Sequence, residues 1–380
     1  MDIDHKTSLL GGLSPAAFMK KHWHRKPLLV RGAWRADKGP FSPLTRAELF
    51  GMAERDDVES RLVVHKSGKW SLRTGPIART MLPKLSQPEW TLLVQGVDLH
   101  VPAARALLER FRFVPDARLD DLMISWASEG GGVGPHLDSY DVFLLQVHGR
   151  RRWRYGPSRD DTFVPSVPLK ILQHFEPVHD EVLEPGDMLY LPPGYAHDGV
   201  AVDGECMTCS VGFRAPRRGE LARDVLQRTL DAFEPEAWSG IYRDPSQPAT
   251  TEPAAIPAQL AHYAAEAVAK LLRESGDMKV AVGEVLSEPK SHVWFEPAEP
   301  AFPQEGEGVR LSPRAIMLYD DDHMYINGES YAASGRDMKA MRVLGNERAL
   351  SARQFAALSE GAQGLLQEWL EAGWLLPDRR

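Results

Sequence analysis

The first 215 residues carry short runs of apolar residues separated by glycine and proline. The clearest of these runs are residues 122–126, 142–147, 188–191 and 207–213. Apolar runs of this length, bounded by Gly or Pro, are typical of β-strands. Several such strands at short spacing favour a barrel or a sandwich. We therefore predict a mainly β first domain, with helices expected before the strands at 15–23, 44–55 and 101–112.

The pattern changes after residue 216. Apolar residues recur at helical intervals over 218–237, and the Ala-rich stretch 258–275 also predicts a helix. From about residue 276 a hairpin is expected, closed around Asp320, Asp321 and Asp322, with small helices at 336–344, 351–358 and 361–372. A hairpin combined with small helices resembles a winged-helix module. The chain thus divides into three regions, 1–216, 217–275 and 276–380.

The strongest chemical signal is the segment GGGVGPHLD, which ends in His136 and Asp138. In extended backbone, residues two apart point to the same side, so this imidazole and this carboxylate lie together. A further histidine on a neighbouring strand would complete a facial triad of two histidines and one carboxylate, which leaves coordination positions open on Fe(II). His197, which follows the turns EPGD and PPG, is the candidate for that third ligand.

Other histidines compete for this role, and an isolated HxD pair is common outside metal sites. His148 has no carboxylate two residues away, whereas Glu176 and Glu181 follow His174 and His179 at that distance, so His174 and His179 stay rival ligands. The flanking strands and the spacing to His197 favour the first assignment.

A second signal is the run of four arginines, Arg150 to Arg152 and Arg154, interrupted by Trp153. Strand alternation puts Arg151 on one face with Trp153 and Tyr155, and the other arginines on the opposite, solvated face. A buried guanidinium needs an anion, and a carboxylate that accepts two hydrogen bonds fits best. That carboxylate could equally belong to an Asp or Glu of the chain itself.

The amino-acid composition limits the classes of protein to which the chain can belong. With 43% hydrophobic and 26% charged residues, and no apolar run long enough to span a membrane, the 380-residue chain is expected to be soluble. Its two cysteines, Cys206 and Cys209, lie three apart on an expected strand and face opposite sides, so we interpret them as packing residues. So few cysteines, without a signal peptide, indicate the cytoplasm.

The net charge of −8 argues against a nucleic-acid partner. The C-terminal region 275–380 is also acidic, with 11 Lys and Arg against 17 Asp and Glu.

Four blocks together, GGGVGPHLDSYDVFLLQ, GRRRWRYG, LEPGDMLYLPPGYAHDG and SVGFRAP, resemble the bacterial ribosomal oxygenases of the Jumonji C, cupin-like class. The N-terminal FMKKHWHRKPLLVRGAW is also similar to that family's opening segment. The resemblance implies a double-stranded β-helix (jelly-roll) catalytic domain over 1–216, a helical dimerisation region over 217–275 and a winged-helix-like domain over 276–380. It also implies a homodimer.

For the site, the resemblance implies Fe(II) bound by His136, Asp138 and His197, with 2-oxoglutarate as cosubstrate. Arg151 matches the residue that pairs with the distal carboxylate of 2-oxoglutarate, and Ser210 is expected to add a hydroxyl there. Ser125 is expected to be a further pocket residue.

The activity implied is hydroxylation of an arginine β-carbon in a large-subunit ribosomal protein, number sixteen, with succinate and CO2 as co-products. Three alternatives stay open: a histidine hydroxylase, a demethylase of the same class, and a non-catalytic cupin-like regulatory protein.

Overall fold

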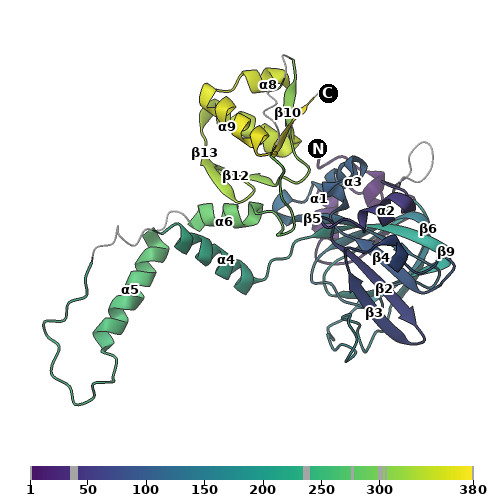
Figure 1. Ribbon diagram of the computed structural model, residues 1–380, viewed down its shortest axis with the longest axis horizontal. Helices are drawn as coiled ribbons and strands as arrows, with labels where there is room; N and C mark the ends of the chain where they lie inside the picture. The colour runs from purple at the N-terminus through teal and green to yellow at the C-terminus, as the bar shows by residue number, and fades with distance from the viewer. Residues whose placement is uncertain are drawn as a thin grey trace. The chain divides into compact units, whose positions relative to one another are not determined.

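The structure, a computed structural model, describes residues 2–34, 42–233, 240–274, 278–297, 303 and 306–378. It contains two compact units, Met1–Ala215 and Pro216–Arg380 (Figure 1). Each unit has its own cluster of buried apolar side chains. The expected boundary between the second and third regions, at 275–276, lies outside the described residues.

The first unit is built on one antiparallel sheet in the order β1-β8-β6-β9-β5-β4-β2-β3, with β7 paired to β6. Its strands are β1 (Leu28–Val30), β2 (Ser60–Lys66), β3 (Lys69–Thr74), β4 (Trp90–Val94), β5 (Leu119–Ala127), β6 (Val142–Pro157), β7 (His179–Leu183), β8 (Met188–Leu191) and β9 (Tyr195–Phe213). Each of the four apolar runs in the sequence forms a strand or part of one, as predicted. The pattern did not reveal β1 to β4 or β7.

The two long strands β6 and β9 pair with each other along most of their length, yet their outer neighbours change midway. The first part of β6 pairs with β8 and the last part with β7. The register shifts between these two parts, around Gly149, whose φ is +59°. A Cβ at Gly149 would lie 2.0 Å from the backbone oxygen of Glu205, so only glycine fits at this bend. Because of this bend, β6 and β9 each take part in both halves of the sheet.

Short helices occur before β1 and between later strands of this unit, and they contribute side chains to its core. They are α1 (Pro15–Lys21), α2 (Arg46–Met52) and α3 (Pro102–Leu108). Ser14 caps α1 with Pro15 in its first turn, and Thr45 and Glu48 form a capping box on α2. These local signals mark the starts of α1 and α2, whereas α3 has Pro102 in its first turn and no side-chain cap.

The second unit combines helices with two three-stranded sheets, β14-β10-β15 and β11-β12-β13. Its helices are α4 (Arg218–Asp231), α5 (Ala258–Glu274), α6 (Met278–Ser287), α7 (Gly335–Glu347), α8 (Ala352–Ala356) and α9 (Glu360–Glu371). Its strands are β10 (Gly308–Leu311), β11 (Met317–Tyr319), β12 (His323–Ile326), β13 (Glu329–Ala332), β14 (Ala349–Leu350) and β15 (Leu375–Asp378). The helix predicted over 218–237 ends at Asp231, and its residues 234–237 lie outside the described part.

The hairpin predicted around the three aspartates is present as β11 and β12, and β13 extends it into a sheet. The small helices expected after it are α7, α8 and α9, and Ser351 caps α8 as part of a capping box. Their apolar faces enclose a core that includes Leu344, Leu366 and Trp369. Among all described residues, no helix is long and apolar enough to cross a membrane.

Candidate metal centre

His136, Asp138 and His197 come together in the first unit, with one ligand atom from each within 4.8 Å of the other two. His197 lies inside β9, and a backbone bridge joins it to His136, with N···O distances of 3.0 and 2.9 Å. The Oδ2 atom of Asp138 lies 3.9 Å from Nε2 of His136 and 3.7 Å from Nε2 of His197. One strand pairing thus aligns residues that are 61 positions apart in the sequence.

The backbone also fixes which nitrogen of each imidazole is available. Nδ1 of His136 lies 3.0 Å from the carbonyl oxygen of Gly134, and Nδ1 of His197 lies 3.1 Å from that of Tyr195. A carbonyl can only accept, so each Nδ1 carries the proton and each Nε2 keeps its lone pair. Both free Nε2 atoms are on the Asp138 side, which is the arrangement a metal ion requires.

Burial keeps His197 in the form that binds metals. The side chain is 3% exposed, and this burial lowers its pKa to about 4, with a further contribution from the neighbouring His136. A neutral imidazole is the ligand form of histidine. Two imidazoles and a carboxylate on one side suit an ion such as Fe(II), with the other positions left for small ligands.

Arg151 is buried beside this cluster, on the face that strand alternation predicts. Arg151, Trp153 and Tyr155 are all 5% exposed or less. The Arg151 guanidinium lies over the Trp153 ring at 4.9 Å, and that ring is 5.9 Å from the His197 ring. The arginines on the opposite face are more exposed. They form ion pairs there, Arg150 with Asp203, Arg152 with Asp180 and Arg154 with Asp198.

The hydrogen bonds of Arg151 go to neutral groups. Nη1 donates to Ser125 Oγ at 2.8 Å and to Thr208 Oγ1 at 3.4 Å, and Nη2 donates to the Gly199 carbonyl at 3.2 Å. Nε has no partner, and no Asp or Glu among the described residues forms an ion pair with Arg151. The internal salt bridge left open by the sequence is therefore absent from the described structure. A buried guanidinium in this state is suited to an anion from outside the chain.

Three adjacent strands supply the polar groups around Arg151. Ser125 on β5 and Gln146 on β6 both lie directly opposite Thr208 on β9. Thr208 also donates to Gln146 Oε1 at 2.8 Å. Ser125 thus contacts Arg151, whereas Ser210, buried two positions after Thr208 on β9, makes no hydrogen bond to it. Sequence reasoning missed Thr208 and Gln146, although alternation places Thr208 on the same strand face as Ser210.

The remaining candidates lie apart from the three ligands. His148 and His174 are exposed, and His179 stacks on Tyr155 at the surface. Cys206 and Cys209 are free and buried, and burial raises the pKa of both thiols, as expected of packing residues.

Two family descriptions match the chain, a JmjC domain over residues 106–221 and a ROXA-like winged helix over residues 270–376. The ribosomal protein uL16 3-hydroxylase of Escherichia coli is 38% identical, and the alignment covers 89% of this chain and 90% of that protein. The bifunctional lysine-specific demethylase and histidyl-hydroxylase NO66 of Drosophila persimilis is 24% identical, with 50% of this chain and 29% of that protein covered.

Solved structures of the E. coli ribosomal oxygenase YcfD match over nearly the whole chain. One has a TM-score of 0.84 at 33% identity, covering 96% of this chain and 98% of that one. Another, a complex with cobalt and 2-oxoglutarate, has a TM-score of 0.79 with the same coverage. The fold predicted from the sequence, a JmjC-type β domain followed by a winged-helix-like domain, is confirmed. With this identity over this length, the chain belongs to the ribosomal oxygenases of the JmjC class.

Proposed function

We propose that this protein is an Fe(II)- and 2-oxoglutarate-dependent oxygenase that hydroxylates the large-subunit ribosomal protein uL16 at the β-carbon of an arginine. The observation that carries the proposal is the pairing of a two-histidine, one-carboxylate cluster with a buried arginine that has no carboxylate partner among the described residues. The similar E. coli protein is named as a uL16 3-hydroxylase, which supplies the substrate.

The side chains present fit both groups. His136, Asp138 and His197 would hold the iron through Nε2, Oδ2 and Nε2. Arg151 would pair with the distal carboxylate of 2-oxoglutarate, supported by the hydroxyls of Ser125 and Thr208. The bound iron would supply the chemistry that consumes O2 and 2-oxoglutarate, inserts one oxygen atom into a C–H bond and releases succinate and CO2.

The chain itself orients the metal ligands and keeps water out of the site. The carbonyls of Gly134 and Tyr195 hold both imidazoles with Nε2 toward Asp138. The Trp153 ring lies next to both His197 and Arg151, so the metal ligand and the arginine could bind the two ends of one dicarboxylate. Burial of His197 and Arg151 keeps competing water away.

The test is a reaction with purified protein and uL16. We expect succinate release that requires Fe(II), 2-oxoglutarate and uL16, with a mass increase of uL16 equal to one oxygen. His136→Ala should abolish release, whereas His174→Ala, at a rival surface histidine, should leave it unchanged. Oxygen added to a histidine, or loss of a methyl group from a lysine, would instead assign the activities named for the NO66 relative. Absence of 2-oxoglutarate turnover with any ribosomal protein would favour a non-catalytic protein.

We also propose that α5 mediates a homodimer, within the region 217–275. Four large apolar side chains on this helix are 37% to 59% exposed, namely Leu260, Tyr263, Val268 and Leu272. Leu260 and Tyr263 are three positions apart and Val268 and Leu272 four, so each pair is adjacent on the helix surface, and a second copy of the same helix could cover them. The cytoplasm, where ribosomal proteins are made, is the proposed location.

Light scattering tests the dimer. Val268→Glu together with Leu272→Glu should convert a dimer of full-length protein to a monomer, because two carboxylates would be buried in an apolar interface. Glu266→Gln and Lys270→Gln, on the same helix, serve as the polar control. A dimer that persists in the Val268→Glu, Leu272→Glu variant would contradict the proposal.

A further inference from the structure

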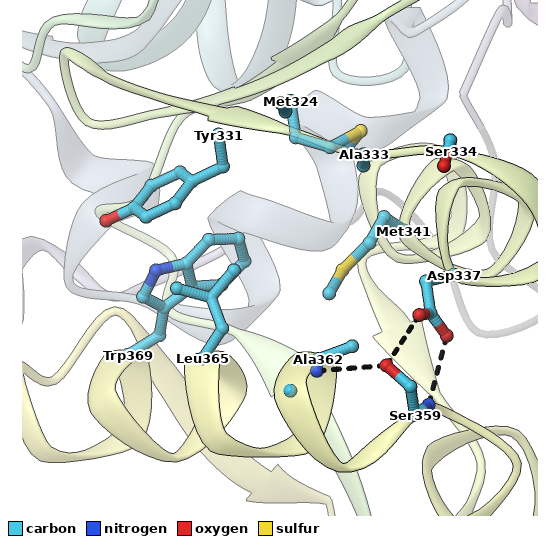
Figure 2. Close-up of a pocket in the computed structure, with 12 residues that line it drawn as sticks. Met324, Tyr331, Ala333, Ser334, Asp337, Met341, Ser359, Ala362, Leu365 and Trp369 are labelled. Atoms are coloured by element: carbon cyan, nitrogen blue, oxygen red, sulfur yellow. Dashed lines mark hydrogen bonds between the residues drawn. The ribbon is translucent and has the colours of Figure 1, made fainter.

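The winged-helix-like domain contains a groove of about 450 Å³ between its β12–β13 hairpin and the helices α7 and α9 (Figure 2). The groove belongs entirely to the second unit, and none of the candidate metal ligands or their neighbours lies in it. It is lined by Met324, Tyr331, Ala332, Ala333, Ser334, Asp337, Met341, Ser359, Gly361, Ala362, Leu365 and Trp369.

The floor of the groove is apolar. Met324, Met341 and Trp369 are 3% exposed or less and belong to the domain core. Tyr331 and Leu365 are partly exposed beside them, and Figure 2 shows both close to the Trp369 indole. Methionine and aromatic side chains form adaptable surfaces for aliphatic side chains, including the long stems of lysine and arginine.

One carboxylate, that of Asp337, lines the groove beside this floor. Asp337 accepts hydrogen bonds from the backbone N and the Oγ of Ser359, at 3.0 and 2.6 Å, and these bonds lower its pKa. Outside the lining, Glu329 accepts a hydrogen bond from the hydroxyl of the lining residue Tyr331 at 2.5 Å. An aspartate held ionised above an apolar floor is a suitable partner for a cationic head group.

The helix α9 reinforces this charge. Its exposed acids are Glu360, Glu368 and Glu371, and it carries neither lysine nor arginine. The facing helix α7 carries Asp337 together with Arg336, Lys339 and Arg342, so apart from Asp337 the acidic character belongs to the α9 side of the groove. Over 275–380 the balance is 11 basic against 17 acidic residues. Nucleic-acid phosphates would be repelled by such a helix, whereas a basic protein segment would be attracted.

We infer that this groove is a second docking site for the ribosomal protein substrate, away from the residue that is hydroxylated. The occupant is a basic segment of uL16 that places an aliphatic stem against Tyr331 and Leu365, which cover the buried floor, and a cationic head at Asp337. This inference rests on the proposed function for the identity of the partner. It gives the winged-helix-like domain the role of raising affinity for the whole protein, since two linked contacts bind more tightly than one.

Two glycines on α9 provide a matched pair of variants. Gly361 lines the groove and Gly364 does not, and a Cβ added at either meets no atom within 4 Å. Gly361→Arg should fill the mouth of the groove with bulk and positive charge, while Gly364→Arg adds the same charge nearby. Both replacements favour the helix, so neither should impair folding.

The experiment compares full-length uL16 with a short synthetic peptide that spans the hydroxylated residue. For Gly361→Arg we expect Kd and KM for full-length uL16 to rise about 5- to 10-fold relative to Gly364→Arg, with kcat unchanged. Turnover of the peptide should be the same in both variants and in the unsubstituted protein.

Equal affinity of the two variants for full-length uL16 would overturn the groove as a docking site. A 23S rRNA fragment that binds the unsubstituted protein and loses affinity only in Gly361→Arg would also overturn it, in favour of nucleic acid. If the unsubstituted protein hydroxylates neither protein nor peptide, yet Gly361→Arg alone weakens uL16 binding, the groove stands and the proposed activity fails.

Discussion

At the residue scale, the site depends on a charged side chain, Arg151, that the fold buries without a carboxylate partner among the described residues. Arg151 is 3% exposed, and among the described residues its side chain hydrogen bonds to the hydroxyls of Ser125 and Thr208 and to the Gly199 carbonyl. Burial of a cation in this way costs free energy in the unliganded chain. That cost is offset when a dicarboxylate binds, so the arginine contributes to affinity for the cosubstrate.

Arg151→Met should therefore weaken use of 2-oxoglutarate and leave the metal in place. We expect KM for 2-oxoglutarate to rise about 10- to 100-fold, because charge-assisted hydrogen bonds contribute about 1.5–3 kcal/mol. Succinate release at varied 2-oxoglutarate gives KM, and titration with Co(II) gives metal affinity. Arg150→Met, on the exposed face of the same strand, is the control. An unchanged KM in Arg151→Met would remove this residue from the cosubstrate site.

His197 makes the stability of the metal-free protein depend on pH. Its pKa is about 4 in the folded chain and returns toward 6.5 on unfolding. Between these values the unfolded chain binds a proton that the folded chain does not, so the free energy of unfolding falls as pH falls from 6.5 to 4. This group contributes roughly 3 kcal/mol, fully present above pH 6.5.

Urea denaturation of the metal-free protein at pH 7 and pH 4.5 measures this effect. The His197→Gln variant should lose less stability between the two pH values than the unsubstituted protein. His174→Gln, at an exposed histidine, should lose as much as the unsubstituted protein does. Equal pH dependence in the His197→Gln variant and the unsubstituted protein would contradict the argument.

At the scale of elements, β6 and β9 position the site because they are long and paired in register. Tyr155, Trp153 and Arg151 on β6 lie opposite His197, Gly199 and Ala201 on β9. Opposite residues of an antiparallel pair share a face, so a metal ligand and an anion-binding arginine face the same interior. The large Trp153 ring between them requires the smallest residue across from it.

Gly199→Ala should disturb both ends of the site at once. A Cβ at this position would lie 2.5 Å from the Trp153 ring, so the ring must move, with a loss of stability of about 1–3 kcal/mol. We expect weaker binding of both Co(II) and 2-oxoglutarate, measured by titration calorimetry, and a lower Tm. Gly212→Ala on the same strand meets its nearest atom at 3.9 Å and should keep an unchanged Tm. An unaltered Gly199→Ala protein would show that Trp153 does not position the site.

At the scale of the whole molecule, chemistry and assembly are assigned to different units. All residues of the metal cluster and of the Arg151 surroundings lie within Met1–Ala215, which has its own core. The proposed dimer helix and the groove lie within Pro216–Arg380.

A fragment of residues 1–215 should therefore fold and bind Co(II) and 2-oxoglutarate with affinities within about 3-fold of the full chain. It should be monomeric, and its KM for full-length uL16 should be higher. Calorimetric titration and light scattering measure these properties. A fragment that unfolds cooperatively but binds no metal would show that the second unit is needed to complete the site.

Much of this protein could be predicted from its sequence because the determining signals are local. Capping residues such as Ser14, Thr45 and Ser351 mark helix starts, and apolar runs between glycines mark strands. The two-residue spacing of His136 and Asp138 predicts a shared face, and alternation predicts that Arg151 is buried with Trp153. Each of these inferences involves residues only a few positions apart.

Only the tertiary structure decided what depends on pairing between distant strands. The choice of His197 over the surface histidines follows from its backbone bridge to His136. The choice of Thr208 as a hydroxyl bonded to Arg151 follows from the register of β5, β6 and β9. Whether an Asp or Glu of the chain forms an ion pair with Arg151 could likewise be seen only in the tertiary structure. Local patterns specify which way a side chain points along its own strand, but register between strands specifies what it meets, because a shift of one residue turns every side chain to the other face.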